Sequence, residues 1–262
     1  MKPTTKHNAK KPAHRNLSTL IGAATVTVVA LASLTISLGW VGDGQAKAAP
    51  ADPHPKPITA LFIGDSFTVG IGAPKTSDGF ATRVSTYFKW RMQNYGVGHT
   101  GYAKGDKTED STISTNCQSD RGCPSYMKQF DQAVAAGVVP DVVIVSGGYN
   151  DAASNELFES AKQLFAKIHA TFASATLYVT SPITVDVVSQ EFALRVAMVR
   201  VAAFQTNAIF LDLGQPLSGK RELRNRIHPN LNGYKVLTKT ITSLIENNEL
   251  TPARLMLRQR VG

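Results

Sequence analysis

This chain of 262 residues contains only two cysteines and six histidines, and the histidines form no cluster in the sequence. A structural zinc site needs about four thiolate or imidazole ligands held close together. Cys117 and Cys123 form a single pair, and neither a second cysteine pair nor a histidine cluster accompanies them. The sequence therefore offers no support for a metal site. In an oxidising compartment two cysteines this close can join, so we expect a loop disulfide between them.

Charged residues are also sparse, at 18% of the chain against 43% hydrophobic residues. Disordered chains combine low hydrophobicity with high net charge, so this composition predicts a globular protein. The net charge of +9 and the basic pI could suggest a nucleic-acid partner, but six of the basic residues and one acidic residue precede residue 49. The rest of the chain is only mildly basic, and its last nine residues hold three arginines. We expect no nucleic-acid partner.

The N-terminal segment has the order of features found in export signals. A basic stretch reaches Arg15, an uncharged stretch of 19 residues runs from Leu20 to Leu38, and Ala46-Lys47-Ala48 has the small-x-small pattern of a cleavage site. The uncharged stretch is also close to the minimum for a membrane span, so an uncleaved anchor is the alternative. In either case the basic flank stays in the cytoplasm and the rest of the chain crosses the membrane.

Composition divides the chain into four parts. We expect a signal peptide or membrane anchor at 1–48, a proline-rich linker at 49–57, one folded domain at 58–250 and a basic tail at 251–262. The domain alternates short apolar runs, typical of buried parallel strands, with stretches of helical periodicity. The expected strands begin near Ile58, Tyr95, Asp141, Ala175 and Ala208, and the expected helices are 80–93, 125–136, 156–173, 187–204 and 231–246. This pattern predicts a three-layer α/β/α domain with a flavodoxin-like, five-stranded parallel sheet.

Three candidate reactive residues follow the expected strands or precede the last helix. Ser66 comes directly after the first strand, Asn150 follows the third, and His228 stands in a loop before the final helix. The carboxyl ends of parallel strands share one edge of a sheet, where ligands bind. A histidine can take the proton of a serine nucleophile, while an amide and backbone N–H groups can stabilise an oxyanion. These residues predict an acyl-transfer site at that edge.

Four segments in chain order resemble the blocks of the SGNH hydrolases, a branch of the GDSL esterases and lipases. They are GDSFTVG from Gly64, NYGVGHTGY from Asn94, GGYND from Gly147 and HPNLNGY from His228. The resemblance implies the same fold from about residue 58 to 246, with Ser66 as nucleophile, Gly98 and Asn150 as oxyanion donors, and His228 as general base. Gly101 is a weaker claimant to the glycine role. Spaced glycines at 96–101 also suggest a dinucleotide site, but they do not open a helix as that motif requires.

One position departs from the family pattern, because Asn225 stands where the family usually has an aspartate, three residues before the histidine. A neutral amide cannot supply the negative charge that stabilises an imidazolium. Three explanations stay open: a Ser-His dyad oriented by a backbone carbonyl or by Asn225, an acid from elsewhere such as Asp212 or Glu222, or a domain that binds without turnover.

These features predict an exported serine esterase that forms an acyl-enzyme on Ser66 and needs no cofactor. The alternative is an SGNH-fold module that binds glycans with little or no turnover. Export favours a small-molecule or glycan ester of the cell envelope as substrate. We expect a monomer, in contact with a membrane only through an uncleaved N-terminal segment.

Overall fold

The computed structural model describes residues 56–105, 117 and 122–259, and the side chains of these residues up to Glu249. The expected signal peptide or anchor, most of the expected linker and the end of the basic tail lie outside the described residues. So does most of the loop that carries the two cysteines.

The domain is built on five parallel strands in the order β2-β1-β3-β4-β5. Their bounds are β1 Thr59–Gly64, β2 Arg91–Asn94, β3 Val142–Ser146, β4 Thr176–Thr180 and β5 Ile209–Leu211. The first strand, β1, takes the second position in the sheet. β2 forms the edge on one side of it, and β3, β4 and β5 follow in turn on the other side. This is the flavodoxin-like order, so the predicted fold class is confirmed.

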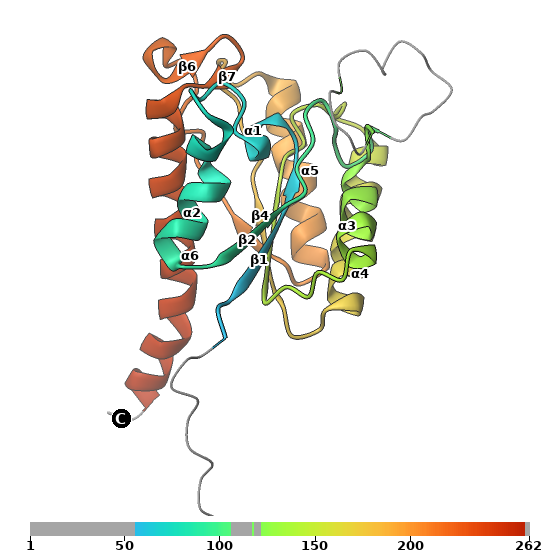
Figure 1. The fold of residues 1–262 in the computed structure, drawn as a ribbon, viewed down its shortest axis with the longest axis vertical. Helices are drawn as coiled ribbons and strands as arrows, with labels where there is room; N and C mark the ends of the chain where they lie inside the picture. Colours follow the sequence, from blue (N-terminus) through green and yellow to red (C-terminus); the bar gives the residue numbers. More distant parts are fainter. Residues whose placement is uncertain (1–55, 106–116, 118–121, 260–262) are drawn as a thin grey trace, which may run out of the picture. The chain divides into compact units, whose positions relative to one another are not determined.

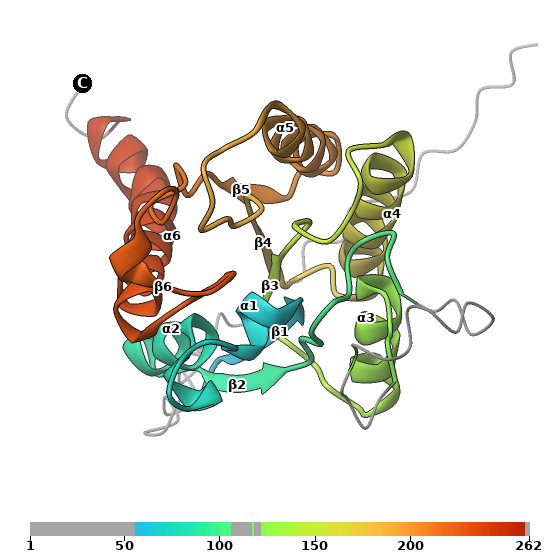
Figure 2. The ribbon, with the colours of Figure 1, turned by 90° about the horizontal axis from the view of Figure 1, so that it is seen from above.

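Helices cover both faces of the sheet (Figures 1 and 2). They are α1 (Ser66–Val69), α2 (Phe80–Phe88), α3 (Tyr126–Ala135), α4 (Asn155–Thr171), α5 (Gln190–Gln205) and α6 (Leu231–Gln259), with the short 3-10 helices η1 (Thr76–Asp78) and η2 (Arg221–Leu223). Seen from above, α2 and α6 lie on one side and α3, α4 and α5 on the other (Figure 2).

Alternation along the strands divides the core into two halves. Phe62 of β1 packs in the cluster that contains residues of α2 and α6, whereas its neighbours Leu61 and Ile63 pack in the cluster of α3, α4 and α5. Successive side chains of a strand point to opposite faces, and all six residues of β1 are buried. An uninterrupted apolar run such as this one is what a parallel strand covered on both faces requires.

Three predicted boundaries differ most from the structure. The helix expected over 80–93 ends at Phe88, because Lys89 adopts a left-handed backbone with φ of 57° and the edge strand begins at Arg91. The strand expected near Tyr95 therefore lies earlier. The N–H groups of Tyr95 and Val97 still donate to the carbonyls of Phe62 and Gly64, so the chain stays beside β1 after β2 has ended. The last helix runs past residue 246 to Gln259.

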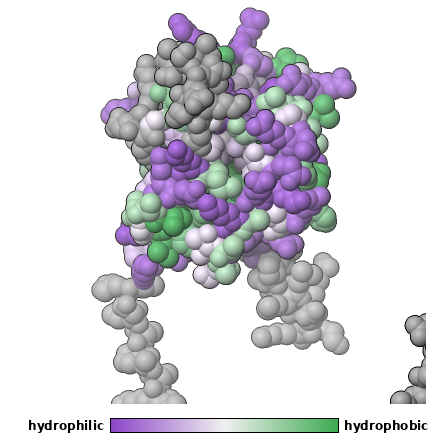
Figure 3. Space-filling model, turned by 90° about the vertical axis from the view of Figure 1, so that its right-hand side faces the viewer, coloured by the Kyte–Doolittle hydropathy of each residue, from purple (hydrophilic) through white to green (hydrophobic). Residues whose placement is uncertain are grey.

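Two further features concern the outside of the domain. Among the residues that the structure describes, no helix combines the length and apolar character that crossing a bilayer demands. Figure 3 shows the side of the molecule that lies to the right in Figure 1, where α3 and α4 are found, and its visible surface is mostly hydrophilic. The hydrophobic residues on this face form small, separate groups, as on an ordinary water-exposed surface.

Candidate active site

Ser66 lies where β1 gives way to α1, at the end of the sheet where the β6–β7 hairpin also lies (Figure 1). Asp65 has an extended backbone and caps α1, accepting a hydrogen bond from the N–H of Phe67 at 2.9 Å. The capping role that a serine often fills therefore belongs to Asp65. The Ser66 hydroxyl instead lies 2.9 Å from Nε2 of His228.

His228 reaches Ser66 from a two-stranded hairpin formed by β6 (Arg224–Asn225) and β7 (His228–Pro229). The hairpin lies against the turn after α1, where Gly72 has a φ of 98°. A Cβ atom at Gly72 would lie 2.7 Å from Cβ of His228 and 2.5 Å from the carbonyl oxygen of Pro229. Only a glycine lets the two loops approach this closely, and their approach sets the distance between imidazole and hydroxyl.

The electrostatic surroundings of His228 favour its neutral form. Partial burial is the main cause that lowers the pKa of His228, and positive charge on His99 lowers it further. The ring also contacts Phe67, with 5.6 Å between ring centroids. A neutral imidazole is the form that can accept a proton from a serine, so this environment suits a general base. The sequence analysis did not single out His99, which has a φ of 65° and lies between Gly98 and Gly101.

The expected third member of the triad is not seen next to the histidine. Asn225 pairs with His228 across the hairpin, and its side chain is exposed. Asp212 forms an ion pair with Arg200 at the surface, and Glu222 lies exposed on η2. Within the described part of the chain, the hydrogen bond to Ser66 is the only one that the imidazole makes, so no described carboxylate orients it.

The two remaining candidates, Gly98 and Asn150, come from the loops after β2 and β3. A Cβ atom at Gly98 would lie 3.7 Å from Cβ of Ser66, so the backbone of Gly98 runs beside the serine. The Asn150 amide donates one N–H to the carbonyl of Thr100 at 2.9 Å, which leaves its second N–H for another acceptor. Gly101 has a different task, because any side chain there would collide with the carboxylate of Asp151.

A buried glutamine that the sequence analysis did not single out joins these loops. Gln129 of α3 is fully buried, and its amide pairs with both the N–H and the carbonyl of Gly64, at 3.0 and 3.1 Å. It also donates to the hydroxyl of Thr100 at 2.9 Å. The end of β1 and the Gly98 loop are therefore fixed to one side chain. An amide on the buried face of an otherwise amphipathic helix is the signal that could have revealed it.

The carboxyl group of Asp65 is buried one residue from Ser66. The hydroxyl of Tyr126 donates to it at 3.2 Å, in addition to the N–H of Phe67. Burial is the main cause that raises the pKa of Asp65 to about 7, and these two hydrogen bonds oppose that rise. A group that titrates near neutral pH thus lies beside the candidate nucleophile.

The structure joins Cys117 and Cys123 in a disulfide with a Cα to Cα distance of 5.6 Å. Among the described residues, no group of three or more histidine, cysteine, aspartate or glutamate side chains is arranged to hold a metal ion. The site itself brings together the hydroxyl of Ser66, the imidazole of His228 and amide donors.

Known structures with this fold include esterases that were crystallised with oligosaccharides. One is a two-domain esterase active on acetylated mannans, crystallised with mannopentaose, with a TM-score of 0.55 and 17% identity over 72% of this chain and 50% of the other. Another is a family two carbohydrate esterase from Clostridium thermocellum in complex with cellohexaose, with a TM-score of 0.57 and 16% identity over 74% of this chain and 66% of the other. The chain thus spans half to two thirds of these proteins, and at such low identity the likeness shows a shared fold.

A search among curated proteins found no match. The sequence does match a family model over most of the described domain. The model of the GDSL-like lipase/acylhydrolase family covers residues 62–236, which is more than half of the chain and includes all the candidate site residues. The chain therefore belongs to the GDSL-like lipase/acylhydrolase family, and the resemblance drawn from its four motifs is confirmed.

Proposed function

We propose that the chain is an exported serine esterase that hydrolyses carboxylic esters through an acyl-enzyme on Ser66. The observation that carries this proposal is the 2.9 Å contact between Oγ of Ser66 and Nε2 of His228, residues 162 positions apart in the chain. Membership of a family of lipases and acylhydrolases supports ester hydrolysis as the reaction. The N-terminal sequence, with its basic flank and uncharged stretch, supports export.

In the proposed reaction Oγ of Ser66 attacks the ester carbonyl carbon while Nε2 of His228 takes the hydroxyl proton. The carbonyl oxygen becomes an oxyanion, which the backbone N–H groups of Ser66 and Gly98 and the free amide N–H of Asn150 stabilise. When the tetrahedral intermediate collapses, the bond to the alcohol oxygen breaks and His228 gives its proton to that oxygen. Water then attacks the acyl carbon while His228 takes one of its protons. The bond from the acyl carbon to Oγ breaks, His228 returns the proton to Oγ, and the acid leaves.

The lowered pKa of His228 bears on the pH at which this chemistry runs. The base must be neutral to accept a proton, so kcat/KM rises with pH through the pKa of the free enzyme. Because burial and His99 place that pKa below the ordinary histidine value of 6.5, the base is already unprotonated at neutral pH. A dyad whose histidine has no carboxylate partner among the described residues gains a ready base in this way, but the imidazolium that forms later lacks the stabilisation that such a carboxylate gives.

For the substrate we propose an O-acylated glycan. Structures that share the fold include an esterase active on acetylated mannans and a carbohydrate esterase in complex with cellohexaose. An exported enzyme meets envelope or extracellular polysaccharides rather than cytosolic metabolites. Loops decide the substrate within a fold, so this part of the proposal needs its own test.

The first test is hydrolysis of 4-nitrophenyl acetate by the purified chain and its Ser66→Ala variant. We expect Ser66→Ala to lower kcat/KM at least a hundredfold, because Ser66 supplies the one hydroxyl that contacts the base among the described residues. Ser77→Ala, which changes an exposed serine on η1, is the matched control and should keep full activity. Equal activity in Ser66→Ala and the parent chain would refute the mechanism.

The structure also gives a reason to test a glycan-binding module without turnover. The imidazole of His228 has no carboxylate partner among the described residues, and loss of that charge costs serine hydrolases several orders of magnitude in kcat. Labelling of Ser66 by a fluorophosphonate probe separates the two functions, since only an activated serine reacts. Binding of an acetylated glycan with no labelling would favour the module.

A further inference from the structure

A cavity of about 260 Å³ opens beside Asn150. Its wall comes from residues 103–105, in the loop after β2, and from residues 150–156, which lead into α4. The cavity therefore touches the residue that the proposed mechanism places at the reacting carbonyl. A group bound there would be attached to, or adjacent to, the ester being cleaved.

The floor of this cavity is held in place by Asp151. Its carboxylate accepts hydrogen bonds from the backbone N–H groups of Tyr102, Ala103 and Lys104, at 3.1, 2.8 and 3.2 Å. These bonds tie the two loops together across about fifty positions of sequence. The cavity is thus formed before any ligand arrives, which lowers the entropic cost of binding.

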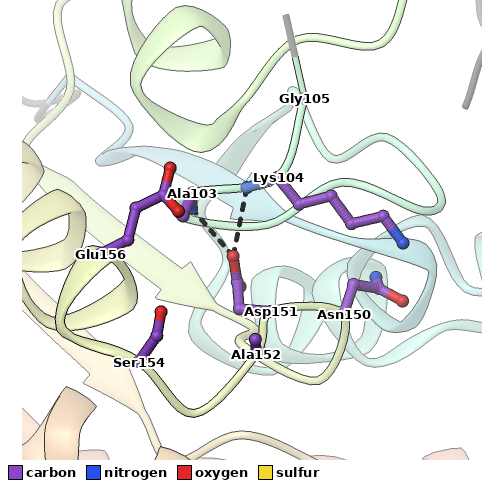
Figure 4. Close-up of a pocket in the computed structure, with 8 residues that line it drawn as sticks. All are labelled: Ala103, Lys104, Gly105, Asn150, Asp151, Ala152, Ser154 and Glu156. Atoms are coloured by element: carbon purple, nitrogen blue, oxygen red, sulfur yellow. Dashed lines mark hydrogen bonds between the residues drawn. The ribbon is translucent and has the colours of Figure 1, made fainter. Parts of the chain in front are cut away.

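Three polar side chains on the wall are available to bind a ligand. In the described part of the chain, Lys104, Ser154 and Glu156 make no side-chain hydrogen bond or ion pair, and Ser154 caps α4 without using its hydroxyl. Figure 4 shows Lys104 and Asn150 extending along one side of the cavity, with Glu156 and Ser154 on the other. The wall therefore offers an ammonium and an amide on one side, and a carboxylate and a hydroxyl on the other.

This mixture of groups fits a neutral polyol better than an ion. The carboxylate of Asp151 is already held by three backbone N–H groups, and the two charged side chains that remain on the wall, Lys104 and Glu156, have opposite signs, so the wall favours neither an anion nor a cation. A sugar hydroxyl both donates and accepts, and it can satisfy the carboxylate and the ammonium in turn. At about 260 Å³ the cavity is large enough to receive one pyranose ring.

We propose that this cavity binds one pyranose ring of the substrate, with Lys104 donating to and Glu156 accepting from its hydroxyls. The inference deepens the proposed function and rests on it for the position of the ester beside Asn150. It assigns to Lys104 and Glu156 a part in selecting sugar esters over simple esters.

The test compares a partially O-acetylated mannan with 4-nitrophenyl acetate, for the full chain and its Lys104→Met and Glu156→Ala variants. We expect each variant to lower kcat/KM for the glycan, relative to kcat/KM for the small ester, at least tenfold through a higher KM. Lys239→Met changes an exposed lysine of α6 and serves as the control, with an unchanged ratio. An unchanged ratio in both cavity variants would overturn the subsite.

Binding to the Ser66→Ala chain separates failure of the subsite from failure of the proposed function. Calorimetry with the same mannan should show a Kd at least tenfold weaker when Lys104→Met or Glu156→Ala is added. If the parent chain hydrolyses neither ester, the esterase proposal fails while this measurement still decides the subsite. Equal Kd values with and without the cavity substitutions, or no binding by the Ser66→Ala chain, would reject it.

Discussion

Asn225 stands directly opposite His228 in the β6–β7 hairpin. The Cβ atoms of such a cross-strand pair lie about 5 Å apart, which brings a carboxylate at position 225 within reach of the imidazole. In the proposed reaction no carboxylate among the described residues is bonded to the imidazolium that forms. We therefore expect Asn225→Asp to raise kcat/KM for 4-nitrophenyl acetate at least tenfold, and to move the acidic limb of the pH profile to higher pH.

Two control variants make this prediction specific. Asn232→Asp adds the same charge at an exposed position at the start of α6, and should change kcat/KM less than threefold. Asn225→Ala removes an amide that makes no hydrogen bond to the imidazole in the described structure, so it should also be nearly neutral. A loss of activity in Asn225→Asp would show that this dyad is adapted to a neutral neighbour.

At the residue scale, sequence could indicate the reactive groups but not the groups that hold them. Ser66 and His228 stand out because their types and their places after a strand and before a helix suggest chemistry. Gln129 and His99 do not, since Gln129 acts through a hydrogen bond with Gly64 and His99 through its charge near His228, and no local pattern encodes either. The same holds for Lys104, whose position beside Asn150 arises only when two distant loops meet.

At the element scale, buried strands are the easiest part of this fold to predict. β1 and β3 are apolar runs buried on both faces, and their predicted starts agree with the structure to within one residue. The edge strand β2 has the sequence RMQN and is largely unburied, so its pattern resembles the end of the preceding helix. Pairing with β1 decides its conformation, and pairing is a tertiary contact that periodicity does not report.

The close approach of the α1 turn to the hairpin yields an element-scale prediction. Gly72→Ala places a Cβ against His228 and Pro229 and should push the hairpin away from Ser66, lowering kcat/KM at least tenfold. Gly137→Ala is the matched control, because Gly137 also has a positive φ, of 74°, but an added Cβ there meets nothing within 4 Å. Both variants should lose about 1 kcal/mol of stability from backbone strain. Only Gly72→Ala should also have a lower kcat/KM. Equal activity in the two variants would contradict the positioning argument.

At the scale of the whole molecule, the buried carboxyl of Asp65 makes stability depend on pH. Its pKa is raised from 3.8 to about 7 in the fold, so the folded state holds this proton more tightly than the unfolded state does. The resulting stabilisation is complete below pH 3.8 and is lost as the pH rises through about 7. Asp151 has a pKa raised in the same direction and adds a change of the same sign.

Asp65→Asn isolates the contribution of this one carboxyl to the stability of the domain. Asparagine keeps the acceptor for the Phe67 N–H and carries no charge, so the variant resembles the protonated parent at every pH. Between pH 5 and pH 8 the free energy of unfolding should fall by roughly 3 kcal/mol more in the parent than in Asp65→Asn. Urea denaturation at several pH values measures both curves, and their difference removes the part of the Asp151 contribution that does not depend on the charge of Asp65. Parallel curves would mean that Asp65 is already ionised at pH 5 in the fold, and that the hydrogen bonds from Phe67 and Tyr126 outweigh its burial.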